Sequence, residues 1–237
     1  MAAIGLLEKY GIKEVADVVF YEINADGTKG KPVLFLDTLK ISTIEQTADQ
    51  AEARGGKGNS PLIIWDYGKE LNVNIEDALY SPQSMSVMFG GAGTTPAEIT
   101  SVNRFEKVTL SAAITSMPTD GTKYYDVANL SEITTTTGLS KGAVVYKDGA
   151  AAVAGHQIVI TAQNFPGTYC LVGETYARNK NTGKDEYFQF EIPQAKMGAE
   201  NNITLEAEGD PSVFNMNMRV LRPDNGEMMI LRQYTIS

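Results

Sequence analysis

The sequence predicts a mainly β protein, and three observations support that class. Its 237 residues include eleven Tyr, eight Phe and many Thr and Val, all of which favour strands. The 22 glycines favour turns that join such strands. Lys69–Glu76 and Val213–Leu221 both alternate apolar and polar residues with the two-residue period of a half-buried strand.

The first expected elements form a hairpin. Asp17–Asn24 and Pro32–Leu39 have strand-like composition, and the turn residues of Ala25–Gly30 lie between them. The preceding segment, Leu6–Ala16, fits either a short helix or a loop. These residues therefore predict two strands joined by a long bend.

The next segment, Ile41–Ala53, is ambiguous because it is polar on both faces. Ser42 is a possible helix N-cap, Glu45 follows at the capping-box spacing, and Gly55 is a possible helix stop. Local signals therefore favour a helix. As a strand, the segment would offer no side to a core of its own chain and would need water or a partner subunit.

A glycine-rich bend and an apolar arm follow. Ala51–Asn59 contains three glycines and an asparagine, which permit the backbone of a tight bend. Pro61–Asp66 carries a short Leu-Ile-Ile-Trp run that predicts a strand covered on both sides. Lys69–Glu76 then alternates regularly and predicts a strand with one buried face.

One short helix is expected at Ser81–Phe89. Ser81 has the chemistry of an N-cap, and Pro82 suits the first helical position. Apolar residues then recur at helical spacing until Gly90 and Gly91 end the pattern.

The middle of the chain is the least regular part, and the strand pattern returns after it. Strands are expected at Arg104–Thr115 and, more weakly, near Tyr124–Thr137 and Ala143–Val153. We interpret residues 91–155 as an insertion or rim elaboration within one domain that spans residues 1–237. The C-terminal third predicts a meander of strands at Gln157–Ala162, Gly167–Lys180, Lys184–Pro193, Ile203–Glu208, Val213–Leu221 and Met228–Ile236.

Composition excludes several function classes. A net charge of −9 argues against a protein that wraps nucleic acid, because such proteins need clustered Lys and Arg to neutralise the phosphates. Cys170 is the single cysteine, so neither an intramolecular disulfide nor a multi-cysteine metal site can form, and the chain fits a reducing cytoplasm. No apolar run approaches the length of a membrane span, so no membrane partner is expected.

The residues that could carry chemistry all have a simpler structural interpretation. His156 is the single histidine and has no orienting partner by spacing, and Cys170 lies in an apolar strand as a small hydrophobe would. Gly55–Asn59 lacks the spacing of a phosphate loop. Two groups of carboxylates lack the order of ligands found in a calcium-binding loop and fit a solvated face instead. They are Glu206, Glu208 and Asp210, and Glu70, Glu76 and Asp77. We therefore predict no enzyme activity, no cofactor, and no catalytic or metal-binding residue.

Two blocks of the sequence carry a resemblance to a known family. Both lie outside the irregular middle, at Ala53–Asn59, Pro61–Glu70, Val73–Leu79 and Ser81-Pro82, and at Leu205–Asn215 and Met218–Leu221. These blocks resemble the tail tube proteins of tailed bacteriophages. The resemblance implies a β-sandwich or distorted barrel with one short flanking helix. It also implies a long protruding hairpin that joins a ring-shaped barrel shared between subunits.

Carried over to this chain, the resemblance makes Ile41–Ala53 and Pro61–Ile75 the two arms of that hairpin, so a strand replaces the helix that local signals favour. It implies a virion structural protein, made in the bacterial host cytoplasm, whose stacked, hexameric rings conduct DNA during ejection without binding it specifically. Implied partners are other copies of the chain, the tape measure protein, the tail terminator and baseplate or tail-tip proteins, with a sheath left open. The lumen candidates are Glu45, Asp49 and Glu52, and the subunit-contact candidates are Arg54, Gly55, Gly56, Lys57, Gly58 and Asn59.

Several alternatives stay open at this point. The same fold would serve the tube of a contractile bacteriocin-like particle or a tail terminator. Trp65 and the eleven tyrosines could instead supply stacking platforms in a carbohydrate-binding β-sandwich, although aromatic residues in apolar strands more often form a core. A β-sandwich hydrolase has the least support, since no spacing marks its acid and base.

Overall fold

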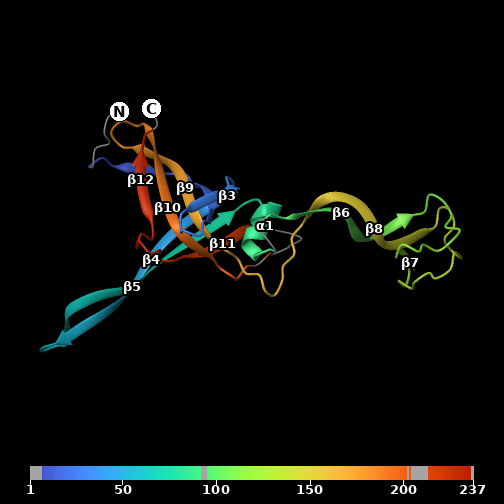
Figure 1. Ribbon diagram of the computed structural model, residues 1–237, viewed down its shortest axis with the longest axis horizontal. Coiled ribbons are helices and arrows are strands. Elements are labelled where there is room, and N and C mark those ends of the chain that lie inside the picture. The colour runs from blue at the N-terminus through green and yellow to red at the C-terminus, as the bar shows by residue number, and fades with distance from the viewer. Residues whose placement is uncertain (1–6, 92–94, 202, 204–212, 236–237) are drawn as a thin grey trace. The chain divides into compact units, whose positions relative to one another are not determined.

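The computed structural model describes residues 7–91, 95–201, 203 and 213–235 (Figure 1). Within these residues the chain is mainly β, with one short helix, which confirms the predicted class. The chain forms two compact units. Met1–Pro96 and Ile158–Ser237 make the larger unit, and Ala97–Gln157 make the smaller one.

The larger unit holds a 9-stranded sheet and the helix α1 (Pro82–Phe89). Strand order along its main path is β3-β2-β9-β10-β11-β5-β4, with β1 beside β9 and β12 beside β10. The strands are β1 (Tyr10–Ile12), β2 (Asp17–Ile23), β3 (Lys29–Leu36), β4 (Leu39–Gly55), β5 (Ser60–Asp77), β9 (Thr168–Asn179), β10 (Asp185–Met197), β11 (Phe214–Val220) and β12 (Ile230–Tyr234).

The sandwich-like fold of this sheet depends on β10, which pairs with two different strands along the same edge. Its first half pairs with β12, from Tyr187 to Glu191, and its last residues, Ala195–Met197, pair with β11. A register shift between Ile192 and Ala195 separates the two pairings. The sheet can therefore fold over its own apolar side, and it is not closed into a barrel, since β3 and β4 end the path unpaired with each other.

One apolar core fills the space between the two halves of this sheet. Strands from both ends of the path contribute side chains that are fully or almost fully buried, and the helix adds two more. They include Val18, Phe20, Val73, Ile75, Val87, Met88, Leu171, Ile192 and Met216. The alternation of Val73 and Ile75 with polar neighbours is the pattern that the sequence predicts for Lys69–Glu76, and that prediction is confirmed.

The helix α1 also confirms its sequence signals. The Ser81 hydroxyl accepts a hydrogen bond from the Ser84 amide at 3.0 Å, and the Ser84 hydroxyl accepts one from the Ser81 amide at 2.8 Å. This reciprocal pair satisfies two amides that the first turn cannot pair internally. Gly90 ends the helix in the left-handed region at φ 66°, and a Cβ there would lie 2.4 Å from the Phe165 backbone.

The smaller unit is a 3-stranded antiparallel sheet in the order β6-β8-β7, with bounds β6 (Ala97–Thr109), β7 (Lys123–Asp126) and β8 (Val144–Gln157). It has its own core of Leu110, Tyr124, Leu139 and Val145. The strands expected near Arg104–Thr115 and Ala143–Val153 are present with shifted ends. The insertion within a single domain stays a prediction.

Four segments differ from their sequence-based expectations or lie partly outside the described residues. Ile41–Ala53 is a strand, as the family resemblance implies, and the helix that its local signals favour is wrong. Its backbone groups pair along a long ladder with β5, which a helix could not form. Leu6–Ala16 contains the short strand β1, which pairs with β9 around Arg178, where a short helix or a loop was expected. Within Gln157–Ala162 only Gln157 belongs to a strand, and residues 158–162 lie outside every described strand. Most of Ile203–Glu208 lies outside the described residues.

Leu171→Ala should lower the free energy of unfolding by about 2–5 kcal/mol, because the side chain is fully buried and its loss leaves a cavity. Urea denaturation followed by circular dichroism measures the change. Leu62→Ala is the matched control, since Leu62 is 68% exposed, and it should change stability by less than about 0.5 kcal/mol. Equal losses in the two variants would contradict the assigned core.

Candidate assembly hairpin

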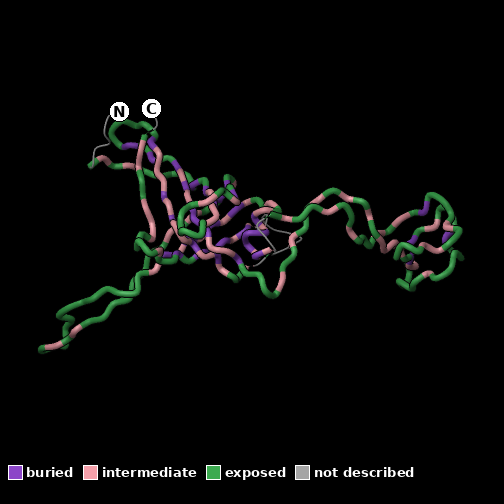
Figure 2. The backbone as a smooth tube through the Cα atoms, in the orientation of Figure 1, coloured by how far each residue is buried: buried purple, intermediate pink, exposed green. Residues whose placement is uncertain are grey.

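The hairpin of β4 and β5 extends beyond the strands that flank it. The two strands pair from Leu39 with Asp77 to Gly55 with Ser60, but β11 pairs with β5 only from Asn72 to Asp77. Beyond Asn72, among the described residues, no third strand borders either arm. Figure 2 shows this part of the hairpin as almost entirely exposed. Both of its outer edges therefore present free backbone donors and acceptors.

The base of the hairpin is tied to the larger unit by a buried carboxylate. Asp77 is 2% exposed, and its Oδ1 accepts hydrogen bonds from the Thr38 hydroxyl at 2.5 Å and the Leu79 amide at 3.3 Å. The Ala78 amide also donates to the Thr38 carbonyl at 3.1 Å. These bonds join the chain just before β4 to the end of β5, so the two arms leave the core together.

A bulge divides the hairpin into a base and a distal part. Thr47 lies opposite Glu70, but Asp49 lies opposite Tyr67. Between these two pairs β5 therefore contains one more residue than β4. Gly68 adopts φ 62°, a left-handed conformation, and a Cβ on it would lie 3.0 Å from Asp49 Oδ2. An extra residue reverses which side of β5 the following side chains occupy and increases the local twist.

We call residues 49–67 the distal ribbon and define its two sides by the register. The apolar side carries Ala51, Ala53, Ile63, Trp65 and Tyr67, because Ala51 lies opposite Trp65 and Ala53 opposite Ile63. Asp49, opposite Tyr67, stands at the start of this side next to the bulge. The three large side chains are 53%, 53% and 57% exposed. Pro61–Asp66 is therefore exposed, with none of the described residues covering it, and the prediction of a strand buried on both sides is wrong for the single subunit.

The charged side of the distal ribbon carries Gln50, Glu52, Arg54, Ile64 and Asp66. The Gln50 side-chain amide donates to Asp66 Oδ1 across the strands at 2.9 Å. Arg54 donates from Nε to Glu52 Oε2 at 2.6 Å along one strand. The polar groups of this side thus find partners on the ribbon itself, although Ile64 stays half exposed among them.

The tip of the ribbon is the glycine turn that the sequence predicts. Gly56 and Gly58 have φ of 77° and 88°, and Asn59 has φ of 48°. The Asn59 amide donates to the Gly56 carbonyl at 3.2 Å and closes the turn. Lys57 projects from the same turn and is exposed. The predicted turn chemistry is confirmed, and the role of these residues in subunit contact stays a prediction.

The three lumen candidates do not share one side of the ribbon. Side chains alternate without interruption along β4 from Ile41 to Arg54, so Glu45 and Asp49 lie on one side and Glu52 on the other. Glu45 lies opposite Asn72, and Glu52 lies opposite Ile64. The numbering already indicates this, because Glu45 and Asp49 are odd positions and Glu52 is an even one, and a regular strand places odd and even positions on opposite sides.

Other residues considered for chemistry are placed as structural groups. Cys170 is 3% exposed, and burial raises the pKa of its thiol to about 11. His156 is exposed near the end of β8. Glu70 forms an ion pair with Arg219 of β11, while Glu206, Glu208 and Asp210 lie outside the described residues. The described residues contain neither a cluster of metal-ligating side chains nor a helix able to span a membrane.

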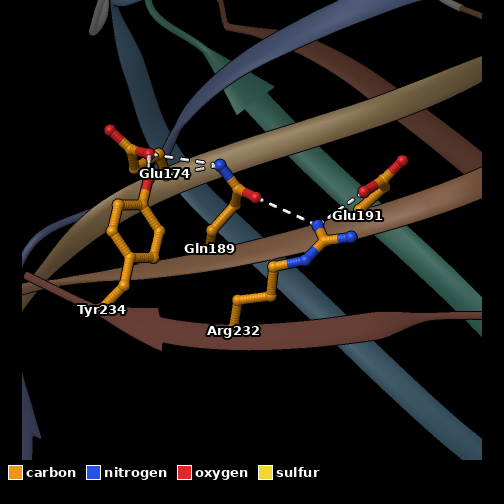
Figure 3. A network of polar contacts seen from close by, with 5 residues as sticks. All are labelled: Glu174, Gln189, Glu191, Arg232 and Tyr234. Carbon is orange, nitrogen blue, oxygen red and sulfur yellow. Dashed lines mark hydrogen bonds and ion pairs between the residues drawn. The ribbon is translucent and has the colours of Figure 1, made fainter. Parts of the chain in front are cut away.

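A polar network that the sequence did not reveal crosses β9, β10 and β12 (Figure 3). The Tyr234 hydroxyl donates to Glu174, and this bond raises the pKa of Tyr234 to about 12. Gln189 donates to Glu174 at 3.3 Å and accepts from Arg232 at 3.1 Å. Arg232 also lies 2.5 Å from Glu191. The network joins side chains that are far apart in sequence and fixes β12 against β10.

Comparison with known proteins identifies the family. The model of the YomU/Tube protein family matches residues 10–231. The chain belongs to this family. It is also 25% identical over 215 residues to a protein of Bacillus phage SPR named "Tail tube protein", an alignment that covers 82% of this chain and 78% of the relative.

Membership confirms the resemblance to phage tail tube proteins. The role of this YomU/Tube family member is therefore structural and not enzymatic, and the protein is a component of the virion. The exposed hairpin is the feature of the fold that such a role can use, since it offers unpaired strand edges and uncovered apolar side chains.

The thiol of Cys170 should react slowly with an aromatic disulfide reagent at mildly alkaline pH in the folded protein. Its pKa of about 11 keeps it protonated there, and burial blocks access. Unfolding in urea should restore the rate of an ordinary thiol. The absorbance of the released thiolate measures both rates, and equal rates would contradict the burial of Cys170.

Proposed function

We propose that this protein is the repeating subunit of a phage tail tube, in which copies join into hexameric rings and the rings stack around a channel that conducts DNA. Family membership supports the tube role. The observation that carries the assembly is the distal ribbon, whose edges and apolar side chains have no partner in the described part of the chain. An isolated two-stranded ribbon is only marginally stable in water, so strands from neighbouring copies supply what it lacks.

Electrostatics suits such a channel. The chain carries a net charge of −9, and the hairpin contributes carboxylates at Glu45, Glu52 and Asp66. Acidic side chains repel DNA phosphates at distances within about 8 Å at physiological salt. A wall of this kind lets the genome slide past without adhering to it. The tape measure protein, the tail terminator and the baseplate or tail-tip proteins complete this proposal as the partners that set tube length and close its ends.

Electron microscopy of the concentrated, purified protein should show rings or tubes with a central channel. A variant in which a two-residue Asn-Gly turn replaces residues 49–67 should keep the circular dichroism of the parent but form no tube, because the core lies outside the ribbon. A parent protein that stays monomeric at high concentration, together with virions that lack it, would refute the proposal. Tubes formed by the shortened variant would refute the role of the ribbon.

We also propose that the smaller unit is an elaboration that tube formation does not require. It has its own core, and its ends are adjacent because Ala97 pairs with Gln157. A chain in which a short Gly-Ser linker replaces residues 97–157 should therefore fold and still form tubes visible by electron microscopy. If the excised chain is folded by circular dichroism but does not assemble, the smaller unit belongs to the assembly surface.

A further inference from the structure

The side of the hairpin that faces away from the core changes character along its length. At the base, Glu45 lies opposite Asn72 on that side, and the neighbouring positions are also polar. Beyond the bulge, the same side of β4 continues through Ala51 and Ala53, and its partners on β5 are Trp65 and Ile63. In a single flat ribbon, this face would be polar at the base and apolar in the distal ribbon. No one environment, water or protein, would then suit its whole length.

We propose, on the basis of the tube assembly above, that the hairpin exchanges its water-facing side at the bulge of Gly68. At the base, the side of Glu45 faces the channel. In the distal ribbon, the charged side faces the channel, and the apolar side is buried against a second copy of this chain. Glu45 and Glu52 then both line the channel although they lie on opposite sides of β4. Asp49 stands at the start of the apolar side, opposite Tyr67, where its carboxylate lies beside Gly68 of the bulge.

The apolar side is suited to contact with another folded chain. Trp65, Ile63 and Tyr67 are large and more than half exposed, and they lie together on one strand. Trp65 and Ile63 lie opposite the small Ala51 and Ala53, which leave space beside these two large side chains that a neighbour can fill. Tyr67 lies opposite Asp49, next to the bulge. Aromatic residues in such a setting are typical of the centre of protein interfaces.

The charged side is suited to water. Gln50 and Asp66 bond to each other across the strands, and Arg54 and Glu52 form an ion pair along one strand. Burying these groups in an interface would require each charge to lose its hydration. Because their hydrogen bonds are already made within the ribbon, this side can face a solvent-filled channel without any further partner.

Gly68 provides the backbone that such an exchange needs. It adopts a left-handed φ of 62°, which is unfavourable for other residues, and its Cα approaches the Asp49 carboxylate so closely that a Cβ would lie 3.0 Å from Oδ2. The register shift lies at this residue, and bulges increase the twist of the strands around them. The ladder also shifts register between Leu39 and Ile41 and between Ala53 and Arg54, but the change of side coincides with the shift at Gly68, which separates the base from the distal ribbon.

Trp65 reports directly on this arrangement because it is the single tryptophan of the chain. On assembly of the unmodified protein into tubes, its fluorescence emission should shift to shorter wavelength and become less accessible to acrylamide quenching. An unchanged emission and unchanged quenching in tubes verified by electron microscopy would overturn the inference. If no tubes form, the proposed function fails instead, so the two failures are distinguishable.

Neighbouring residues give a matched test of the two sides. Gln50 and Ala51 are adjacent, both are exposed, and they lie on opposite sides of β4. In unassembled protein, Gln50→Cys and Ala51→Cys should react with a small maleimide at similar rates, with the parent as the control for Cys170. In purified tubes, the rate for Ala51→Cys should fall by about tenfold or more, as for a buried thiol, and that for Gln50→Cys should change little.

Equal or reversed rates in those tubes would overturn the assignment of the two sides. If Ala51→Cys prevents assembly, the fluorescence of the unmodified tubes decides the question. Full reactivity at Ala51→Cys in tubes assembled from this protein alone, with protection only after another tail protein is added, would also overturn the assignment of a second copy as the occupant.

Gly68→Ala tests the bulge itself. The substitution should leave thermal unfolding of the core unchanged but raise the protein concentration needed for tube formation by about tenfold, the effect expected from the cost of a left-handed alanine. Gly27→Ala is the control, since Gly27 has φ of 79°, nothing within 4 Å of its added Cβ and a position in the turn between β2 and β3. If both variants assemble alike, the bulge does not direct the exchange.

Discussion

The pairing of β4 with β5 is the interaction on which the rest of this structure depends. The two strands, of 17 and 18 residues, run far beyond the sheet that supports them. Their shared ladder satisfies one edge of each strand and leaves the other edge free over the distal ribbon. A core, a helix and seven further strands hold the base of this ladder, and none of the described residues covers its end.

That arrangement explains how one hairpin can contain both core residues and exposed apolar residues. Val73 and Ile75 are buried because β11, α1 and the strands of the opposite half surround them. Trp65 lies only a few residues away on the same strand, yet it is 53% exposed, because the pairing of β11 with β5 ends at Asn72. The difference lies in what surrounds each segment and not in hydrophobicity. For a family whose members build tubes, uncovered apolar residues on an extended ribbon fit contact with further copies.

Much of the fold could be predicted from the sequence where the signals are local. The capping residues around Ser81, the glycines of the hairpin tip and the alternation at Lys69–Glu76 each depend on neighbours within a few positions, and all three are confirmed. The strand at Ile41–Ala53 was indicated only by the family resemblance. Its local capping signals favour the wrong structure, because its conformation depends on a partner strand. The bulge at Gly68 was missed for the same reason, since a register shift exists only between two strands.

The sequence by itself determined the mainly β class, the short helix, the turn positions and the structural role through its family resemblance. The tertiary structure alone decided that β4 runs without a bulge between Glu45 and Glu52, that β5 has one at Gly68, and that the apolar run near Trp65 is exposed. The physical reason is the range of the interactions involved. Caps, turns and alternation are encoded within one segment, but register, sidedness and burial depend on which distant segment pairs beside it and where that pairing ends.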